Sequence, residues 1–166
     1  MSMHAALIEV SKWLASTSLS QTIQTAGWII PMLQTIHILC VAVVFTSAVL
    51  VDFRIWRLFE RDVPLPQVAR RFLPSIWPVL VMLLLTGGLL IIGEPRRSLL
   101  NATFYIKMSL LLGAILLTAG LQGSIALRPV FWQNRRVTGR ALATLSILIW
   151  CGILFAGRWI AYTQVG

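Results

Sequence analysis

The sequence has few charged residues, which make up 11% of its 166 positions. A soluble domain usually carries about a quarter. Hydrophobic residues make up 58% of the chain. This balance excludes an ordinary soluble domain and indicates a protein whose main solvent is lipid.

Cysteine is also scarce, with two residues in the chain. Cys40 and Cys151 each lie inside an apolar run, without CxxC or Cys/His spacing. This excludes a disulfide framework and a zinc site by spacing, and we expect both side chains to be buried as small apolar residues.

Four apolar stretches are long enough to cross a bilayer, for which about 20 residues suffice. They predict an all-α integral membrane four-helix bundle in the lipid bilayer, formed by residues 25–166. We expect the spans at residues 27–51, 72–93, 102–127 and 141–162. Residues 1–24 lack the basic start and the continuous apolar stretch of a signal peptide. They predict a retained, short amphipathic helix at the membrane surface, because Leu7, Val10 and Leu14 recur at helical spacing.

The net charge of the chain is +9, and the positions of the basic residues follow a pattern. They gather at the ends of the apolar runs, as membrane topology requires, so we expect no nucleic-acid partner. The first and third connections carry nine arginines, namely Arg54, Arg57, Arg61, Arg70, Arg71, Arg128, Arg135, Arg136 and Arg140. The opposite side carries Lys12, Arg96 and Arg97. The positive-inside rule makes the first side cytoplasmic, and it predicts a multi-pass protein of a bacterial inner membrane with both termini outside.

Small residues recur at four-residue spacing in the third span, as Ala119 with Gly123 and Gly120 with Ser124. Such positions predict close helix packing in lipid, either within the chain or in a homo-oligomer. At the end of the first span, Asp52 and Arg54 predict an interfacial ion pair that fixes the end of the helix.

Three polar side chains occupy the outer half of the predicted bundle. His37 lies about 13 Å below the outer end of its span, and Lys107 and Arg158 lie about 7 to 8 Å below theirs. Neutral imidazole is a good iron ligand, and cations nearer the surface suit haem propionates. This order predicts a haem b site, although snorkelling cations and a hydrogen-bonded histidine would give the same pattern.

No second axial ligand is evident. Met82 lies at about the depth of His37, and Met108 is slightly shallower. Methionine can ligate haem iron, but packing is its commoner role in a membrane helix. The iron is then either five-coordinate or bound by one of these residues, and His4 is a candidate ligand for a second haem near the surface.

From Trp13 onward the chain resembles an uncharacterised family of bacterial four-helix membrane proteins. The similar stretches are WIIPMLQTIHI at 28–38, VDFR at 51–54, TGG at 86–88, FYIK at 104–107 and AGRWIAY at 156–162. This resemblance implies the fold but no reaction.

A more distant likeness is to membrane-bound, haem-containing protoporphyrinogen oxidases and to copper-resistance D-type membrane proteins. In this likeness His37, Arg54 and Lys107 resemble the oxidase's first-helix histidine, the basic end of that helix and a later lysine. The resemblance implies that His37 ligates haem and that Lys107 contacts a propionate or a porphyrin substrate.

Three functions stay open from the sequence. The first is a b-type cytochrome that transfers electrons within the membrane, with quinone or a redox protein as partner. The second is a porphyrin or quinone oxidoreductase with the same haem. The third is a cofactor-free membrane subunit or small transporter in which His37, Lys107 and Arg158 line a polar pathway.

The charge count predicts the topology directly. A reporter fused after Gly166 should be active only on the periplasmic side, and one inserted between Arg61 and Arg70 only in the cytoplasm. The opposite pair of activities would invert the predicted orientation.

Overall fold

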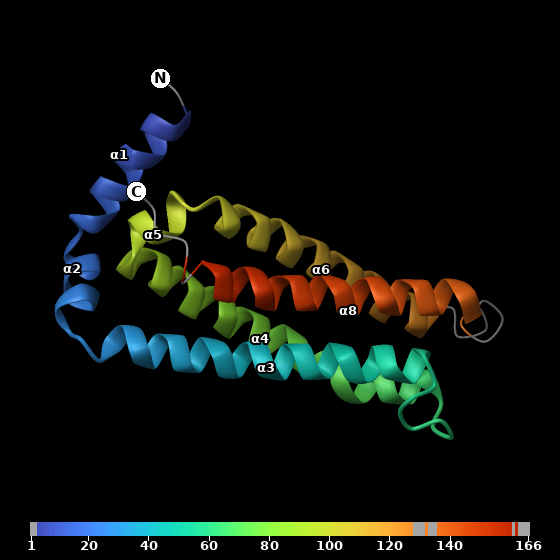
Figure 1. Cartoon of the computed structure of the whole chain (residues 1–166). Coiled ribbons are helices and arrows are strands. Elements are labelled where there is room, and N and C mark those ends of the chain that lie inside the picture. Colours follow the sequence, from blue (N-terminus) through green and yellow to red (C-terminus); the bar gives the residue numbers. More distant parts are fainter. Residues whose placement is uncertain (1–2, 128–131, 133–135, 161, 163–166) are drawn as a thin grey trace.

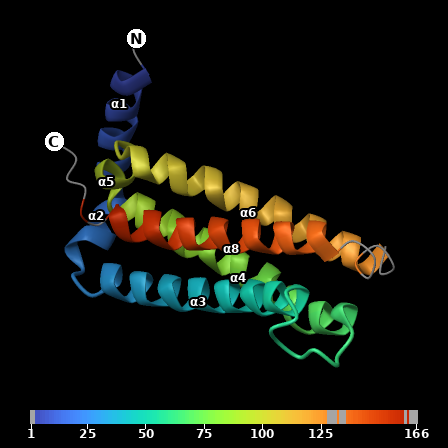
Figure 2. The same cartoon turned by 45° about the vertical axis from the view of Figure 1, so that its right-hand side comes forward.

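A computed structural model describes residues 3–127, 132, 136–160 and 162, except for the side chains of Met3, His4 and Arg136. Four long helices run antiparallel to their neighbours (Figures 1 and 2). They are α3 (Ile29–Ile55), α4 (Leu65–Gly93), α6 (Ala102–Leu127) and α8 (Arg136–Trp159). Three shorter helices, α1 (Met3–Ala15), α2 (Ser18–Thr25) and α5 (Pro95–Leu99), lie together at one end, which we call the α5 end. We call the opposite end the Arg-rich end.

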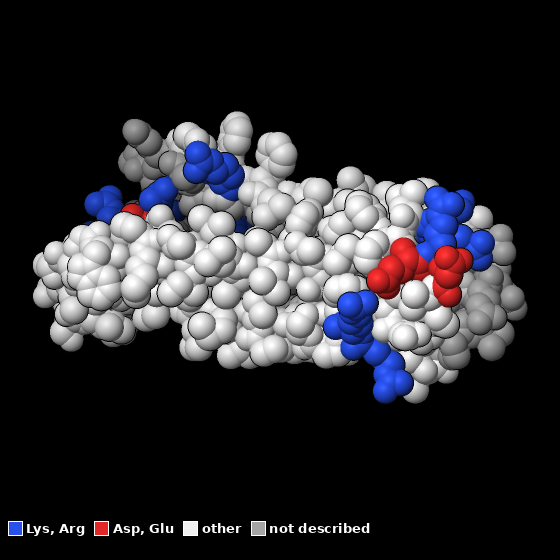
Figure 3. Space-filling view, turned by 90° about the horizontal axis from the view of Figure 1, so that it is seen from below, with Lys and Arg blue, Asp and Glu red and all other residues white. Residues whose placement is uncertain are grey.

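All four long helices are long and apolar enough to cross a membrane. The described residues form helices and connections only, so the predicted all-α membrane four-helix bundle is confirmed. Figure 3 shows one face of the molecule, on which a broad band without Lys, Arg, Asp or Glu separates charged groups near the two ends. The chain is therefore a multi-pass membrane protein.

Three helices, α3, α4 and α8, extend further at one end than the apolar runs predict. α4 begins at Leu65 instead of residue 72, and α3 continues past residue 51 to Ile55. A helix does not need apolar residues to continue, so its polar turns project beyond the hydrocarbon. Pro74 and Pro78 lie inside α4 without ending it. α6 has the predicted bounds, whereas α8 begins earlier than residue 141 and ends at Trp159.

The core is formed most extensively between α3 and α4 and between α6 and α8. Its members are buried apolar residues, and they include Val44, Val51, Leu73, Ile76, Ile125 and Trp150. α4 and α6 touch less, and there the Trp77 indole donates a hydrogen bond to Gln122 Oε1 at 2.8 Å. In lipid such packing and hydrogen bonds between helices hold the bundle together.

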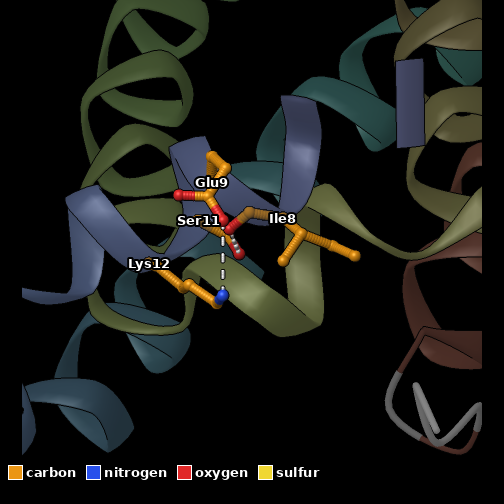
Figure 4. A network of polar contacts seen from close by, with 4 residues as sticks. All are labelled: Ile8, Glu9, Ser11 and Lys12. Atoms are coloured by element: carbon orange, nitrogen blue, oxygen red, sulfur yellow. Dashed lines mark hydrogen bonds and ion pairs between the residues drawn. The ribbon is translucent and has the colours of Figure 1, made fainter. Parts of the chain in front are cut away.

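The N-terminal segment forms two helices where the sequence predicts one. Ser16 and Thr17 interrupt it, and the Thr17 side chain caps α2 by accepting from the Ser20 amide. α1 packs on α5 and α2 on α4, where Ser20 Oγ donates to the Ile92 carbonyl at 2.6 Å. Figure 4 shows the polar contacts on α1, where Lys12 pairs with Glu9 at 3.3 Å. Both helices are therefore docked on the bundle.

The Asp52 and Arg54 side chains point to different partners. Arg54 donates to the carbonyls of Val63 and Arg61, at 2.7 and 3.3 Å. Asp52 is 1% exposed and hydrogen-bonds Ser146 on α8. The predicted ion pair between the two residues is wrong, because positions two apart on a helix face different directions.

Gly120 and Gly123 of α6 do not bring helices of this chain together. Within the described part of the chain, a Cβ built at Gly120 or Gly123 meets no atom within 4 Å. The prediction of close packing within the chain is therefore wrong for these two glycines. The tightest glycine contact is elsewhere, because a Cβ on Gly93 of α4 would lie 2.8 Å from Ile23 Cγ2 of α2.

Gly93→Ala should therefore separate α2 from α4. We expect a loss of about 1 to 3 kcal/mol in unfolding free energy, the usual effect of forcing a methyl group into a packed contact. Gly120→Ala is the matched control and should be neutral or slightly stabilising, because alanine favours helix and the position is open. Denaturation in detergent, followed by circular dichroism, measures both. Equal stability of the two variants would contradict the docking of α2.

Candidate functional site

His37 on α3 and Thr86 on α4 form a polar contact near the α5 end of the bundle. His37 Nδ1 lies 2.9 Å from Thr86 Oγ1. The two residues meet because α3 and α4 run antiparallel and pack along much of their length. Gly87 follows Thr86, and a Cβ there would lie 3.4 Å from His37 Cε1. The glycine thus lets the imidazole lie close against the α4 backbone.

The hydroxyl of Thr86 determines which ring nitrogen of His37 carries hydrogen. Thr86 Oγ1 also lies 2.8 Å from the carbonyl oxygen of Met82 and 3.3 Å from that of Leu83. Carbonyl oxygens only accept, so the single hydroxyl hydrogen is directed to the backbone. His37 Nδ1 must then donate to Oγ1. In the neutral imidazole this leaves Nε2 with a free lone pair.

Lys107 on α6 is the charged residue associated with this contact. Its side chain is half-buried and lies within electrostatic range of His37. It passes the backbone of α8 at Gly157, where a Cβ would lie 3.6 Å from Nζ. In the described part of the chain, Nζ has no carboxylate partner and no hydrogen-bond acceptor. A half-buried cation without a counter-ion in an apolar helix bundle favours an anionic ligand.

The other predicted site residues are arranged differently. Arg158 is exposed, and its guanidinium lies over the Tyr162 ring at 4.9 Å and donates to the Tyr162 hydroxyl. Met82 and Met108 are 45% and 38% exposed. His4 belongs to α1, but its side chain lies outside the described part of the structure. The structure thus places Lys107 within electrostatic range of His37, and the ligand roles of all six residues stay predictions.

The donor set limits what this site can hold. No group of three His, Cys, Asp or Glu side chains suited to a metal ion occurs among the described residues. Among the described residues, a free metal ion therefore lacks the cage of about four protein ligands that structural zinc sites use. A cofactor that carries its own metal ligands and a carboxylate fits this site better than a free metal ion. The protein then has to supply only one imidazole and one cation. Haem has these properties.

Thr86 is the residue that sequence reasoning missed. It lies in the TGG stretch at 86–88, whose glycines attract attention as packing positions. The sequence offered one signal for its role. Thr86 is a hydroxyl residue in a predicted span, at about the same depth as His37 in the neighbouring span. Reading that signal requires the antiparallel register of the two helices, which the sequence does not give.

A family of unknown function, DUF6644, matches residues 11–163. The chain belongs to this family. The match confirms the predicted resemblance to a family without an assigned reaction, and it spans all four long helices, so both His37 and Lys107 lie within the family's region. No significant match was found among curated proteins or among solved structures. The likeness to haem-containing protoporphyrinogen oxidases and copper-resistance D-type proteins stays a prediction.

Thr86→Val should remove the partner of His37 Nδ1 while keeping the shape of the side chain. We expect the imidazole to lose its fixed tautomer, whereas Thr86→Ser should retain it. Nitrogen-15 NMR of histidine-labelled protein reports the tautomer. A His4→Gln background leaves one histidine, because the chain has two. An unchanged tautomer in Thr86→Val would show that the hydroxyl does not orient the ring.

Proposed function

We propose that the protein binds one haem b near the α5 end of the bundle and transfers electrons within the membrane. The observation that carries the proposal is the combination of a His37 ring held by Thr86, with its Nε2 lone pair free, and a half-buried Lys107 without a counter-ion in the described part of the chain. A haem with one protein ligand needs one axial imidazole, and a cation beside a propionate would compensate its charge.

His37 would supply the axial nitrogen through Nε2. A ligating histidine commonly donates its other ring N–H to a fixed acceptor, which sets the tautomer and makes the ligand nitrogen more basic. Thr86 Oγ1 is that acceptor, and its own hydrogen is used by the α4 backbone. Gly87 keeps side-chain atoms away from the edge of the ring.

Lys107 would hold a propionate. A carboxylate in an apolar bundle is costly without a cation, and a single buried cation is costly without an anion. Each group thus offsets the burial cost of the other. Gly157 leaves the lysine side chain room to lie across α8.

The bound haem would supply reversible one-electron chemistry, and the helices would supply ligation, charge compensation and exclusion of water. Quinone in the bilayer, or a redox protein at the α5 end, is the proposed partner. The positive-inside rule makes the Arg-rich end cytoplasmic, consistent with a bacterial inner membrane and termini outside. The open face of Gly120 and Gly123 is consistent with a homo-oligomer.

His37→Ala should insert and fold but lose haem. The substitution removes one half-buried side chain, which leaves only a modest cavity, and four apolar helices remain. The haem-to-protein ratio, measured by pyridine haemochrome after purification in one detergent, should fall to near zero.

His4→Ala is the matched control, because it removes the other histidine and should keep the haem. Full haem occupancy in His37→Ala would contradict the assignment and transfer the ligand role to His4 or Met82. A partial loss in both variants would contradict the single-haem proposal and favour two haems per chain.

A further inference from the structure

Asp52 is a buried acid at the Arg-rich end of the bundle, far from the proposed haem site. It lies on α3, is 1% exposed, and hydrogen-bonds Ser146 on α8, which is 3% exposed. Its second oxygen, Oδ2, is buried and has no hydrogen-bond partner among the described residues. Fifteen residues separate it from His37, about 22 Å along the helix.

The basic residues around Asp52 are directed elsewhere. On α3 and its loop, Arg54 donates to two loop carbonyls. On α8, Arg140 lies over the Trp56 ring at 5.3 Å. On α4, Arg70 is exposed and Arg71 pairs with Glu60 at 3.4 Å.

The side chains of Arg128, Arg135 and Arg136 lie outside the described part of the structure. Among the described residues, no cation pairs with Asp52. Within the described part of the chain, the carboxyl group is thus buried without the counter-ion that an ionised form would need.

A second buried polar group, on α8, also lacks a partner among the described residues. Trp150 lies one turn beyond Ser146 on α8, on the same face of the helix. It is 2% exposed, and its indole Nε1 has no acceptor among the described residues. This face of α8 therefore carries two buried polar groups, of which Ser146 interacts with Asp52.

We propose that Asp52 is a proton-binding site, in which the buried side chain is a neutral carboxylic acid with its hydrogen on one oxygen. An ionised carboxylate without a cation is very costly in an apolar interior, and such a group takes up a proton instead. The neutral acid offers one O–H donor and one carbonyl acceptor. Ser146 takes one of these roles.

The position of Asp52 makes exchange of this proton feasible. It lies three residues before the end of α3 at Ile55, about 4.5 Å along the helix, next to the loop that carries Arg57 and Arg61. The site is therefore close to water at the Arg-rich end. The Asp52 site involves neither His37 nor haem. Its test is therefore independent of the test of the proposed electron transfer.

Because the chain has few acidic residues, the protonation state of one buried acid can be measured. The chain has five acidic residues. Three are ion-paired, namely Glu9 with Lys12, Glu60 with Arg71 and Glu94 with Arg97. Asp62 is exposed in the loop between α3 and α4. Asp52 is the acid that burial sets apart from the other four.

Infrared spectroscopy of the full chain in lipid nanodiscs tests the proposal. At neutral pH we expect the wild type to show the carbonyl stretch of a protonated carboxylic acid, sensitive to exchange into heavy water. Asp52→Asn should remove this band. The matched control Asp62→Asn should keep it and lose a carboxylate band instead. Loss of a carboxylate band in Asp52→Asn would overturn the proposal.

The wild type alone keeps the proposal testable if Asp52→Asn does not insert. Raising the pH of the wild-type sample should convert the acid band into carboxylate absorption. Dicyclohexylcarbodiimide, an apolar reagent that attacks protonated carboxyl groups, should modify Asp52 more slowly over the same pH rise. A wild type without an acid band at neutral pH would overturn the proposal, whatever the reagent does.

Discussion

Inside a bilayer every polar group must find a partner in the protein, because water is absent. The Thr86 hydroxyl shows how this constraint leads to chemistry. Its hydrogen is directed to the carbonyls of its own helix, so it can only accept from His37. The imidazole is thereby fixed as one tautomer, with the other nitrogen free. A backbone hydrogen bond on α4 thus determines what a side chain on α3 can bind.

The same constraint applies to the polar groups that have no partner among the described residues. Lys107, near the α5 end, is a base, and Asp52, near the Arg-rich end, is an acid. The two residues lie near opposite ends of the bundle. A charge buried in an apolar interior without a partner is costly. The proposals resolve the two costs differently, because Lys107 binds an anionic group while Asp52 takes up a proton.

The sequence predicts the architecture well because span length and hydropathy follow directly from the thickness of the bilayer. α6 has the predicted bounds. The start of α4 is missed because its first turns are polar, and polarity does not end a helix. Composition alone therefore locates the apolar part of each helix and not its ends.

The candidate site could be predicted only in part. His37 and Lys107 stand out because they are polar residues in apolar runs, and the structure brings them into electrostatic range. The role of Thr86 depends on the register between α3 and α4. The predicted pair of Asp52 with Arg54 fails for a related reason, because closeness in sequence does not place two side chains on one helix face.

The most direct test of the account is the visible spectrum of the wild-type protein, purified in detergent from cells supplied with haem. We predict a Soret band from bound haem that shifts after reduction with dithionite. A folded, four-helix protein with no Soret absorption under these conditions would contradict the central claim.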